Sequence, residues 1–270
     1  MQVGTDGNYT TIKIRMVFMD KKAVFKEITD KFETESMKYY CEDMIEKIPD
    51  YIFTMPSSTS RKYHNFTQCL THGQIYHIVM FGKIVNYRLD LKANKEKFNN
   101  AIERDAMRCV SIFHDAIKCG WNGSAYTVHE HPILAGEWVR TTKVEHDVDD
   151  EIKDMIARMC ERHSGEWTTN KRSKVILPEP ETEMEIFIHE CDILSSRSDI
   201  DLPPSDYLKG ILGEKSYEKP TIDTYVFNFG KHNGKSFKTV MEEDPSYLTY
   251  LKSANYSKEP LRTFLSQIDV

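Results

Sequence analysis

Residues 101–118, AIERDAMRCVSIFHDAIK, decide the fold of this chain. Apolar residues recur along this stretch with the spacing of an amphipathic helix, at Ile102, Ala106, Cys109, Val110, Phe113 and Ile117. His114 and Asp115 therefore leave a surface that packs on a core. A buried imidazole beside a carboxylate is costly unless both are hydrogen-bonded, paired or ligated. The stretch predicts a helical protein with a metal site at the end of this helix.

Length and composition predict one full-sized domain and a smaller unit, because 270 residues with 40% hydrophobic content can bury a real core. The net charge of -6 argues against broad electrostatic binding to nucleic acid, although a local basic groove remains compatible with it. The six cysteines form no C-x-x-C pair and are expected to be reduced core residues. No apolar run approaches the roughly 20 residues of a membrane helix, so we expect no membrane partner and a cytoplasmic location.

Four further segments have helical spacing. One helical region runs from about Lys21 to Ile48 with a break near Glu33–Ser36, and another from Gln68 to Val85. The helix from Asp149 repeats the apolar spacing of residues 102–117 and brings His163 to its core-facing side. A last helix carries Ile186, Ile188, Cys191, Asp192 and Leu194. Between the last two helices, a polar loop contains Lys171, Arg172 and Lys174, which we interpret as a solvated cluster.

The chain divides into four predicted parts. Residues 1–49 form an N-terminal helical segment that packs on the core, and residues 50–200 form the main domain. Residues 201–221 are rich in Asp, Pro, Ser, Gly and Lys and are predicted to be a linker. Residues 222–270 change in character, with a strand-like stretch at 225–229, a hairpin signal at Asn233-Gly234 and a helix after Asp244-Pro245. We therefore expect a mainly α fold, a helical bundle with a small α+β C-terminal module.

Candidate metal ligands lie at the ends or inner faces of separate helices, which is how a helical bundle builds a metal site. The set is His64, His72, His114, Asp115, His129, His131, His163 and Asp192. Imidazole and carboxylate without thiolate suit Mn, Fe, Co, Ni or Zn. Of His129 and His131 only one is expected to ligate, and Pro132 favours His131. We interpret the other histidines as structural or surface residues: His77, His146, His189 and His232.

Residues 50–200 resemble the HD-domain metal-dependent phosphohydrolases, which are named for an adjacent His and Asp. Five elements occur in the family's order: Cys69-Leu-Thr-His72, His114-Asp115 with Lys118, His131-Pro132 followed by Gly136, His163-Ser-Gly, and Asp192 followed by Arg197. The segment from Phe53 to His64 also resembles the one before the first ligand in phage and bacterial HD proteins and in HD-domain 3′-to-5′ exoribonucleases. Two positions depart from the pattern. Residues 66–71 replace the usual Gly-Gly-Leu-Leu-Glu phrase, which weakens His72, and Ile117 replaces a glycine.

The HD resemblance implies roles for individual residues. His72, His114, Asp115 and Asp192 would bind one divalent ion. His131 and His163 would hold a second, with Asp115 bridging, so that one or two ions of Mn, Fe, Ni, Mg, Co or Zn are expected. Asp115 would hold a metal-activated water and accept its proton, while Lys118 steadies the phosphate charge. Substrate contacts are expected from His64, Arg61, Lys62 and Arg197.

The C-terminal residues resemble the small module at the C-terminus of exodeoxyribonuclease X-type proteins. The resemblance rests on residues 229–237, FGKHNGKSF, and on the phrase from Glu243 to Leu251. Lys231, Lys235 and Lys238 lie near Phe237 and other aromatic residues, a combination that can hold a nucleic-acid strand by stacking and phosphate contact. A small folding unit with surface lysines is the alternative interpretation.

Three functions follow as hypotheses. The leading one is a metal-dependent phosphohydrolase or phosphodiesterase that attacks a phosphoester of a nucleotide or short oligonucleotide. The second is a 3′-to-5′ exonuclease, in which the C-terminal module feeds single-stranded nucleic acid to the HD site. The third is a non-catalytic nucleotide-binding protein. The sequence leaves the oligomeric state open.

Overall fold

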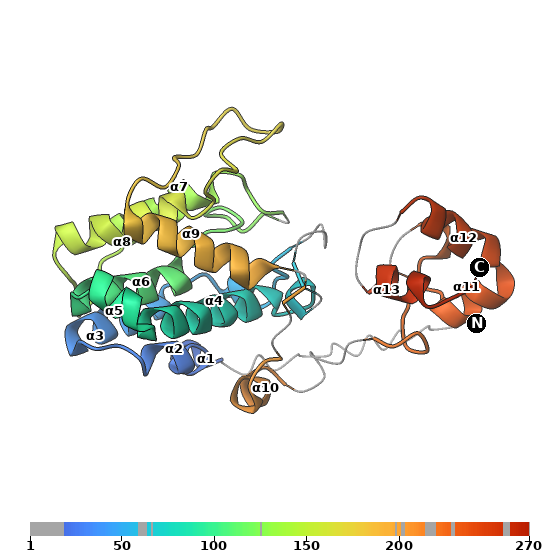
Figure 1. The fold of residues 1–270 in the computed structure, drawn as a ribbon, viewed down its shortest axis with the longest axis horizontal. Helices are drawn as coiled ribbons and strands as arrows, with labels where there is room; N and C mark the ends of the chain where they lie inside the picture. The colour runs from blue at the N-terminus through green and yellow to red at the C-terminus, as the bar shows by residue number, and fades with distance from the viewer. Residues whose placement is uncertain are drawn as a thin grey trace, which may run out of the picture.

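The computed structural model describes residues 19–58, 64–65, 67–124, 126–197, 199–200, 203–213, 220–227, 230–255 and 260–269. These residues are mainly helical, as expected (Figure 1). Their buried side chains form two hydrophobic cores, one in residues 24–212 and one in residues 225–265. Arg61, Lys62 and Phe229 lie outside the described residues.

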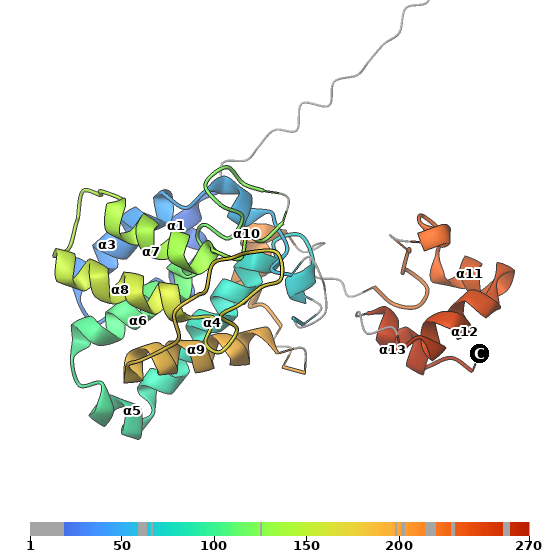
Figure 2. The same ribbon diagram turned by 90° about the horizontal axis from the view of Figure 1, so that it is seen from above.

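Five helices build the main bundle and place the site. They are α4 (Gly73–Asp90), α6 (Ala101–Phe113), α7 (His131–Thr141), α8 (Asp150–Arg162) and α9 (Glu183–Ser196). Helix α4 packs on both α6 and α9, α6 packs on α8, and α8 pairs with α7 (Figures 1 and 2). The helix predicted over residues 101–118 is α6, but it ends at Phe113 and the chain continues in turns from His114. It begins where the Asn100 side chain accepts a hydrogen bond from the Ile102 amide, which caps the first turn.

The N-terminal helices cover one side of the bundle. They are α1 (Lys21–Val24), α2 (Lys26–Thr29) and α3 (Glu35–Glu46). The chain breaks between α2 and α3 because the buried Asp105 carboxylate of α6 accepts hydrogen bonds from the Glu33 amide at 3.0 Å and the Thr34 amide at 2.8 Å. The break expected near residues 33–36 thus lies at 30–34.

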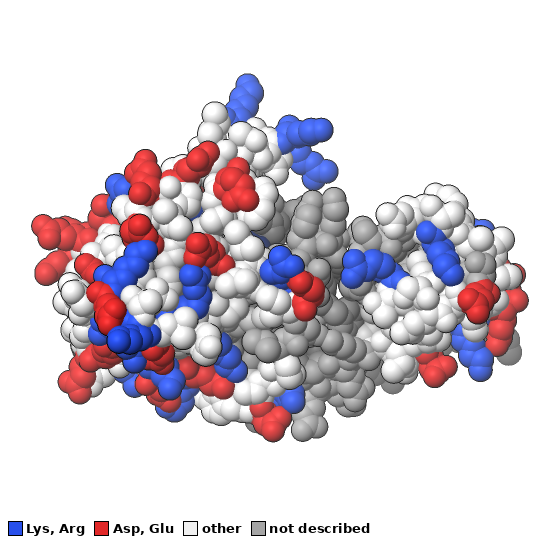
Figure 3. Space-filling model, in the orientation of Figure 1, with Lys and Arg blue, Asp and Glu red and all other residues white. Residues whose placement is uncertain are grey.

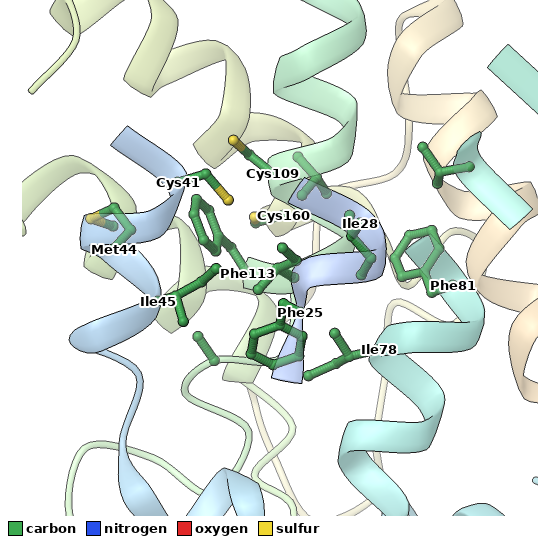
Figure 4. Close-up of a cluster of buried hydrophobic side chains, with 14 of the residues drawn as sticks. Phe25, Ile28, Cys41, Met44, Ile45, Ile78, Phe81, Cys109, Phe113 and Cys160 are labelled. Atoms are coloured by element: carbon green, nitrogen blue, oxygen red, sulfur yellow. The ribbon is translucent and has the colours of Figure 1, made fainter. Parts of the chain in front are cut away.

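The core between these helices contains cysteine as well as aromatic and aliphatic side chains. Figure 4 shows Cys41, Cys109 and Cys160 near Phe113, with Phe25 and Phe81 in the same cluster. All six cysteines are buried and none of them forms a disulfide. This is the reduced core role that the sequence predicts.

Helix α4 has short elements on both sides. The 3-10 turns η1 (Asp50–Phe53) and η2 (Thr67–Cys69) precede it. The short helix α5 (Lys92–Lys97) follows it. Helix α4 begins at Gly73 rather than near Gln68, because His72 adopts a left-handed conformation with φ 62°. A Cβ on Gly73 would lie 2.1 Å from the Gln68 carbonyl oxygen, so only glycine fits at this corner.

The segment expected to be a linker contains helix α10 (Asp206–Leu212). Its Leu208 and Leu212 side chains are buried in the main core, and the Tyr207 hydroxyl donates to the Ala23 carbonyl at 2.9 Å. Two well-spaced leucines within polar sequence are enough to fold this segment onto α1.

The C-terminal unit is more helical than predicted. Its helices are α11 (Phe237–Glu243), α12 (Pro245–Ser253) and α13 (Leu261–Ser266), preceded by the 3-10 turn η4 (Gly230–His232). Within residues 220–227 and 230–255, β structure is limited to one antiparallel bridge between Val226 and Ser236. The predicted α+β module is therefore not seen, since α11 begins directly after this bridge and leaves no room for a second strand.

None of the described helices has both the length and the apolar composition that crossing a bilayer requires.

Candidate metal centre

Four histidine side chains converge at one end of the bundle. His77 lies within α4, His114 follows α6, His131 begins α7 and His163 follows α8. Neighbouring rings have centroids 4.9 Å apart for His114 and His163, 5.1 Å for His77 and His114, and 5.3 Å for His131 and His163. Four separate helices thus contribute to one cluster.

The Nδ1 atoms of three of these rings are bound to protein oxygens. His131 Nδ1 donates to the Val128 carbonyl at 2.8 Å and His163 Nδ1 to the Cys160 carbonyl at 2.7 Å. His77 Nδ1 lies 3.2 Å from the Ser195 hydroxyl oxygen, whose own proton goes to the Asp192 carbonyl. Because Nδ1 carries the proton in each case, Nε2 presents a lone pair, as in metal-binding histidines.

His77, His114, Asp115 and Asp192 form one group of atoms whose spacing could hold an ion. His77 Nε2 lies 3.1 Å from His114 Nε2 and 3.1 Å from Asp192 Oδ1, and His114 Nε2 lies 3.2 Å from Asp115 Oδ2. Two ligands bound to one ion at about 2.1 Å, with angles of 90° to 109°, are about 3.0–3.4 Å apart. The observed separations match this spacing.

Two further imidazoles lie near the other oxygen of Asp115. His131 Nε2 is 3.0 Å from Asp115 Oδ1, and His163 Nε2 is 3.9 Å from the same atom. The carboxylate of Asp115 thus faces one group of ligands with each oxygen. This geometry suits a bridging ligand between two ions.

Several ligand atoms of the cluster lack the hydrogen bonds that buried polar atoms normally make. Asp115 Oδ1 and Asp192 Oδ1 are buried without a hydrogen bond, although imidazole nitrogens lie about 3 Å away. His77 Nε2 and His114 Nε2 also face each other at 3.1 Å. His114 Nδ1 is buried without a hydrogen-bond partner, so the contact between the two Nε2 atoms needs either a proton on His114 Nε2 or a cation between the rings. His114 and His163 with Asp115, and His77 and His114 with Asp192, are groups with the spacing of metal ligands.

The electrostatics of the cluster favour ionised carboxylates and neutral rings at His77 and His163. His114 differs, because burial opposes its charge but the adjacent Asp115 carboxylate leaves its pKa raised. Burial and the nearby His114 lower the pKa of His163 to about 3, and burial lowers the pKa of His77. Burial alone would raise the pKa of Asp115, but the Lys118 ammonium and His114 hold it well below its usual value. Burial opposes ionisation of Asp192 as well, yet the neighbouring His77 leaves its pKa lowered. Neutral imidazole and carboxylate are the protonation states that bind metal.

Lys118 is part of the centre, and its ammonium group is hydrogen-bonded to three protein side chains. Its Nζ donates to Asp115 Oδ2 at 2.6 Å, to Gln74 Oε1 at 2.9 Å and to the Ser57 hydroxyl at 3.4 Å. Gln74 Nε2 donates to the same Asp115 oxygen at 2.9 Å. Lys118 and Gln74 together orient Asp115. Gln74 and Ser57 were not predicted from the sequence, because neither residue type marks a site without the fold.

His72 makes no contact with the cluster among the described contacts, whereas His77, interpreted from the sequence as structural or surface, lies within it. Among the described residues, the contact found for the His72 side chain is a short one from Nδ1 to the Phe53 carbonyl. His72 caps α4 in a left-handed conformation, whereas His77 lies more than one turn further along the helix and faces α6 and α9. No sequence signal singles out His77, because every residue from Gly73 to Gly82 is buried and only the tertiary fold shows which of them faces α6 and α9.

The predicted substrate contacts have different outcomes. His64 lies beside the centre, with its ring centroid 5.3 Å from that of His77 and its Nδ1 2.7 Å from Gln68 Oε1. Arg197 is exposed and pairs with Asp199 at 2.6 Å, away from the cluster contacts. His129 Nε2 lies 3.2 Å from the Val175 carbonyl, so the structure favours His131 over His129 as a ligand. The predictions for Arg61 and Lys62 fall on residues outside the description.

The predicted strand-binding residues of the C-terminal unit are largely engaged in its own fold. Phe237 is completely buried, so its ring is not available to stack on a base. Lys231 pairs with Asp244 at 2.6 Å and Lys235 pairs with Glu243 at 2.5 Å. Among the described residues of this unit, Tyr225 and Phe237 thus point into its core instead of standing beside the lysines on the surface.

Comparison with known proteins places only the C-terminal unit. Residues 227–255 match the family model described as Exodeoxyribonuclease X-like C-terminal. No curated protein and no solved structure matches the chain. The match agrees with the resemblance found in the sequence and links the C-terminal unit to a nuclease-type family, while the bundle is characterised by its fold and metal centre alone.

Proposed function

We propose that the bundle is an HD-type metal-dependent phosphohydrolase that cleaves a phosphoester of a nucleotide or oligonucleotide. The observation that carries the proposal is the convergence of His77, His114, Asp115 and Asp192 on one point, with His131 and His163 on the second oxygen of Asp115. A divalent ion bound there supplies activated water and neutralises phosphoryl charge.

The side chains around the centre have separate tasks in this proposal. Asp115 is buried between both groups of ligands, which suits it to orient the attacking water and take its proton. Lys118 fixes Asp115 and keeps it ionised, which replaces the direct phosphate contact expected from sequence. Asp192 is the more exposed carboxylate, with 18% of its side chain accessible, so substrate reaches the centre on its side.

A second candidate, a 3′-to-5′ exonuclease, is favoured by the match of residues 227–255 to an exodeoxyribonuclease X-like module. Both candidates use the same centre and differ in the length of the substrate. The remaining alternative is a nucleotide-binding protein without turnover, and hydrolysis of any tested substrate would exclude it.

The test is a substrate panel with the purified chain. Mono-, di- and triphosphates, cyclic dinucleotides and short single strands are each incubated with Mn²⁺, Mg²⁺, Ni²⁺ or Zn²⁺, and product release is measured. Asp115→Asn should remove metal content and hydrolysis together, while the exposed Asp206→Asn serves as a control of equal charge change. Absence of hydrolysis across the panel, or full activity in Asp115→Asn, would refute the proposal.

A further inference from the structure

Two loops beside the metal centre carry exposed aromatic and basic side chains that the proposed function does not use. The first loop joins Lys118 to His131, and the second follows His163. We call the set Trp121, Trp167, Lys171, Arg172 and Lys174 the rim. Two of the three tryptophans of the chain belong to it, with Trp121 50% and Trp167 59% exposed, whereas Trp138 is buried.

The basic part of the rim has unsatisfied charge. Within the part of the chain that the structure describes, no carboxylate lies within ion-pair distance of Lys171, Arg172 or Lys174, and all three are exposed. Most Lys and Arg side chains of the bundle instead have an acidic partner, as Lys97 has Glu183. Figure 3 shows Lys and Arg side chains gathered at the tip of the loop after α8. The basic side chains are therefore free to contact an anion.

Hydrogen bonds tie the second loop to the metal centre. The Val175 carbonyl, next to Lys174, lies 3.2 Å from His129 Nε2, two residues before the ligand His131. The Ser173 hydroxyl makes a short hydrogen bond to the Glu130 carboxylate. The basic side chains thus stand on a segment that is fastened to the start of α7.

Trp167 is also linked to the centre, through His189. Its ring lies 5.8 Å from that of His189, whose Nδ1 donates to the His163 carbonyl at 2.8 Å. Gly165 makes this packing possible, because a Cβ there would lie 1.9 Å from the His189 ring. The indole is therefore held near a proposed ligand although most of its surface is open to solvent.

Trp121 borders an open hollow in the first loop. Val128, Glu130 and Leu134 line the same hollow, and Glu130 is the residue that binds the second loop. A hollow with one indole wall and apolar neighbours suits the flat face of a nucleobase. Exposed aromatic surface and unpaired cations then lie in one region around the centre.

We infer that the substrate of this centre is a single-stranded polynucleotide, gripped by the rim. This inference rests on the proposed function and names its substrate class. Stacking on Trp121 and Trp167 requires unpaired bases, while Lys171, Arg172 and Lys174 contact phosphates beyond the one that is cleaved. A mononucleotide has one base and leaves most of this surface unused.

Binding is measured without turnover, on the full chain in EDTA. Fluorescently labelled single strands of DNA and RNA of about 12 nucleotides, and a duplex of the same length, are titrated at several salt concentrations. We expect both single strands to bind more tightly than the duplex. Arg172→Ala/Lys174→Ala should weaken binding and reduce the slope of log affinity against log salt by about 1.4, because each lost phosphate contact contributes about 0.7.

The matched control is Lys31→Ala/Lys47→Ala, which removes two exposed cations that also lack an ion-pair partner among the described residues. It should leave affinity and slope unchanged. Trp121→Ala and Trp167→Ala should each weaken binding between about 5-fold and 150-fold. Quenching of tryptophan fluorescence on binding should disappear in Trp121→Phe/Trp167→Phe, which keeps only the buried Trp138.

Three results would overturn the inference. They are an equal loss of affinity in Arg172→Ala/Lys174→Ala and in Lys31→Ala/Lys47→Ala, tighter binding of the duplex than of the single strands, or single-strand affinity that is unchanged in both Trp121→Ala and Trp167→Ala. The proposed function is judged separately by hydrolysis of bis(p-nitrophenyl) phosphate with Mn²⁺ in the unmodified chain. Hydrolysis without rim-dependent binding would refute the substrate class alone. Rim-dependent binding without hydrolysis of any phosphoester would refute the proposed function alone.

Discussion

The sharpest prediction concerns which histidine near the start of α4 binds the metal. The sequence favours His72 for this role, whereas the geometry of the structure favours His77. His77 Nε2 lies 3.1 Å from both His114 Nε2 and Asp192 Oδ1, whereas the contact found for His72 is to the Phe53 carbonyl. We expect His77→Gln to lose most of the metal affinity. His72→Gln should keep it, and serves as the matched control.

The size of the effect follows from linkage between binding and folding. Loss of a residue that only supports a ligand weakens metal binding by about 10- to 100-fold, so loss of the ligand itself should cost at least about 100-fold. At a Mn²⁺ concentration of about 100 times the dissociation constant, the unmodified chain gains about 2.7 kcal/mol of stability. His77→Gln would gain only about 0.4 kcal/mol at that concentration. The difference corresponds to a loss of about 5–9 °C in the metal-induced rise of Tm.

The assay compares melting with Mn²⁺ and with EDTA for each protein, so that any destabilisation of the metal-free fold cancels. Bound metal is counted independently by elemental analysis after gel filtration. His77 is buried, and its replacement also disturbs Ser195, which is why the difference between the two melts is used rather than either melt alone. A metal-induced shift that survives in His77→Gln but vanishes in His72→Gln would refute the assignment.

Three further predictions concern the scaffold. Gly82→Ala should lower the free energy of unfolding by about 1–3 kcal/mol in a urea titration, because its Cβ would lie 2.3 Å from the Ile28 side chain, and unchanged stability would show that this contact yields freely. Gln74→Leu should lower the free energy of unfolding in urea by about 1–3 kcal/mol, because Lys118 and Asp115 each lose a hydrogen-bond partner. Unchanged stability would show that Gln74 does not support this network. The hydrogen bond from Arg104 lowers the pKa of Glu33 from 4.5 to about 2 despite partial burial, so Glu33 stabilises the fold above pH 4.5 and loses this effect between pH 4.5 and 2. Glu33→Gln should therefore be about 1 kcal/mol less stable at neutral pH and equal to the unmodified chain near pH 2, and a difference that does not depend on pH would contradict this.

Helical periodicity predicted the parts of the site that lie where a helix ends. His114 and His163 follow equally spaced apolar faces in α6 and α8, so their burial could be deduced from the sequence alone. Asp192 could be placed in the same way on α9. These positions depend only on local spacing, which a single sequence displays directly.

His77 could not be found in this way, because its role depends on where α4 begins. The left-handed residue at position 72 and the tight approach of Gly73 to the Gln68 carbonyl set that start. Every residue from Gly73 to Gly82 is buried, so apolar spacing does not single out one face. Gln74 and Ser57 could not be predicted as site residues for a related reason. They accept hydrogen bonds from Lys118, and only the tertiary fold brings these segments together.

The net charge of -6 predicts weak affinity for a polynucleotide, but ion pairing reduces the weight of this prediction. An acidic chain repels phosphate only where its carboxylates are unpaired, and many acids of the bundle are bound to neighbouring cations, as Glu161 is to Arg140. Charges neutralised in pairs contribute little field beyond a Debye length of about 8 Å. The loop with Arg172 and Lys174 keeps its charge, because it has no such partners in the described structure. Affinity for a polyanion is therefore governed by the location of unpaired cations rather than by their number in the sequence.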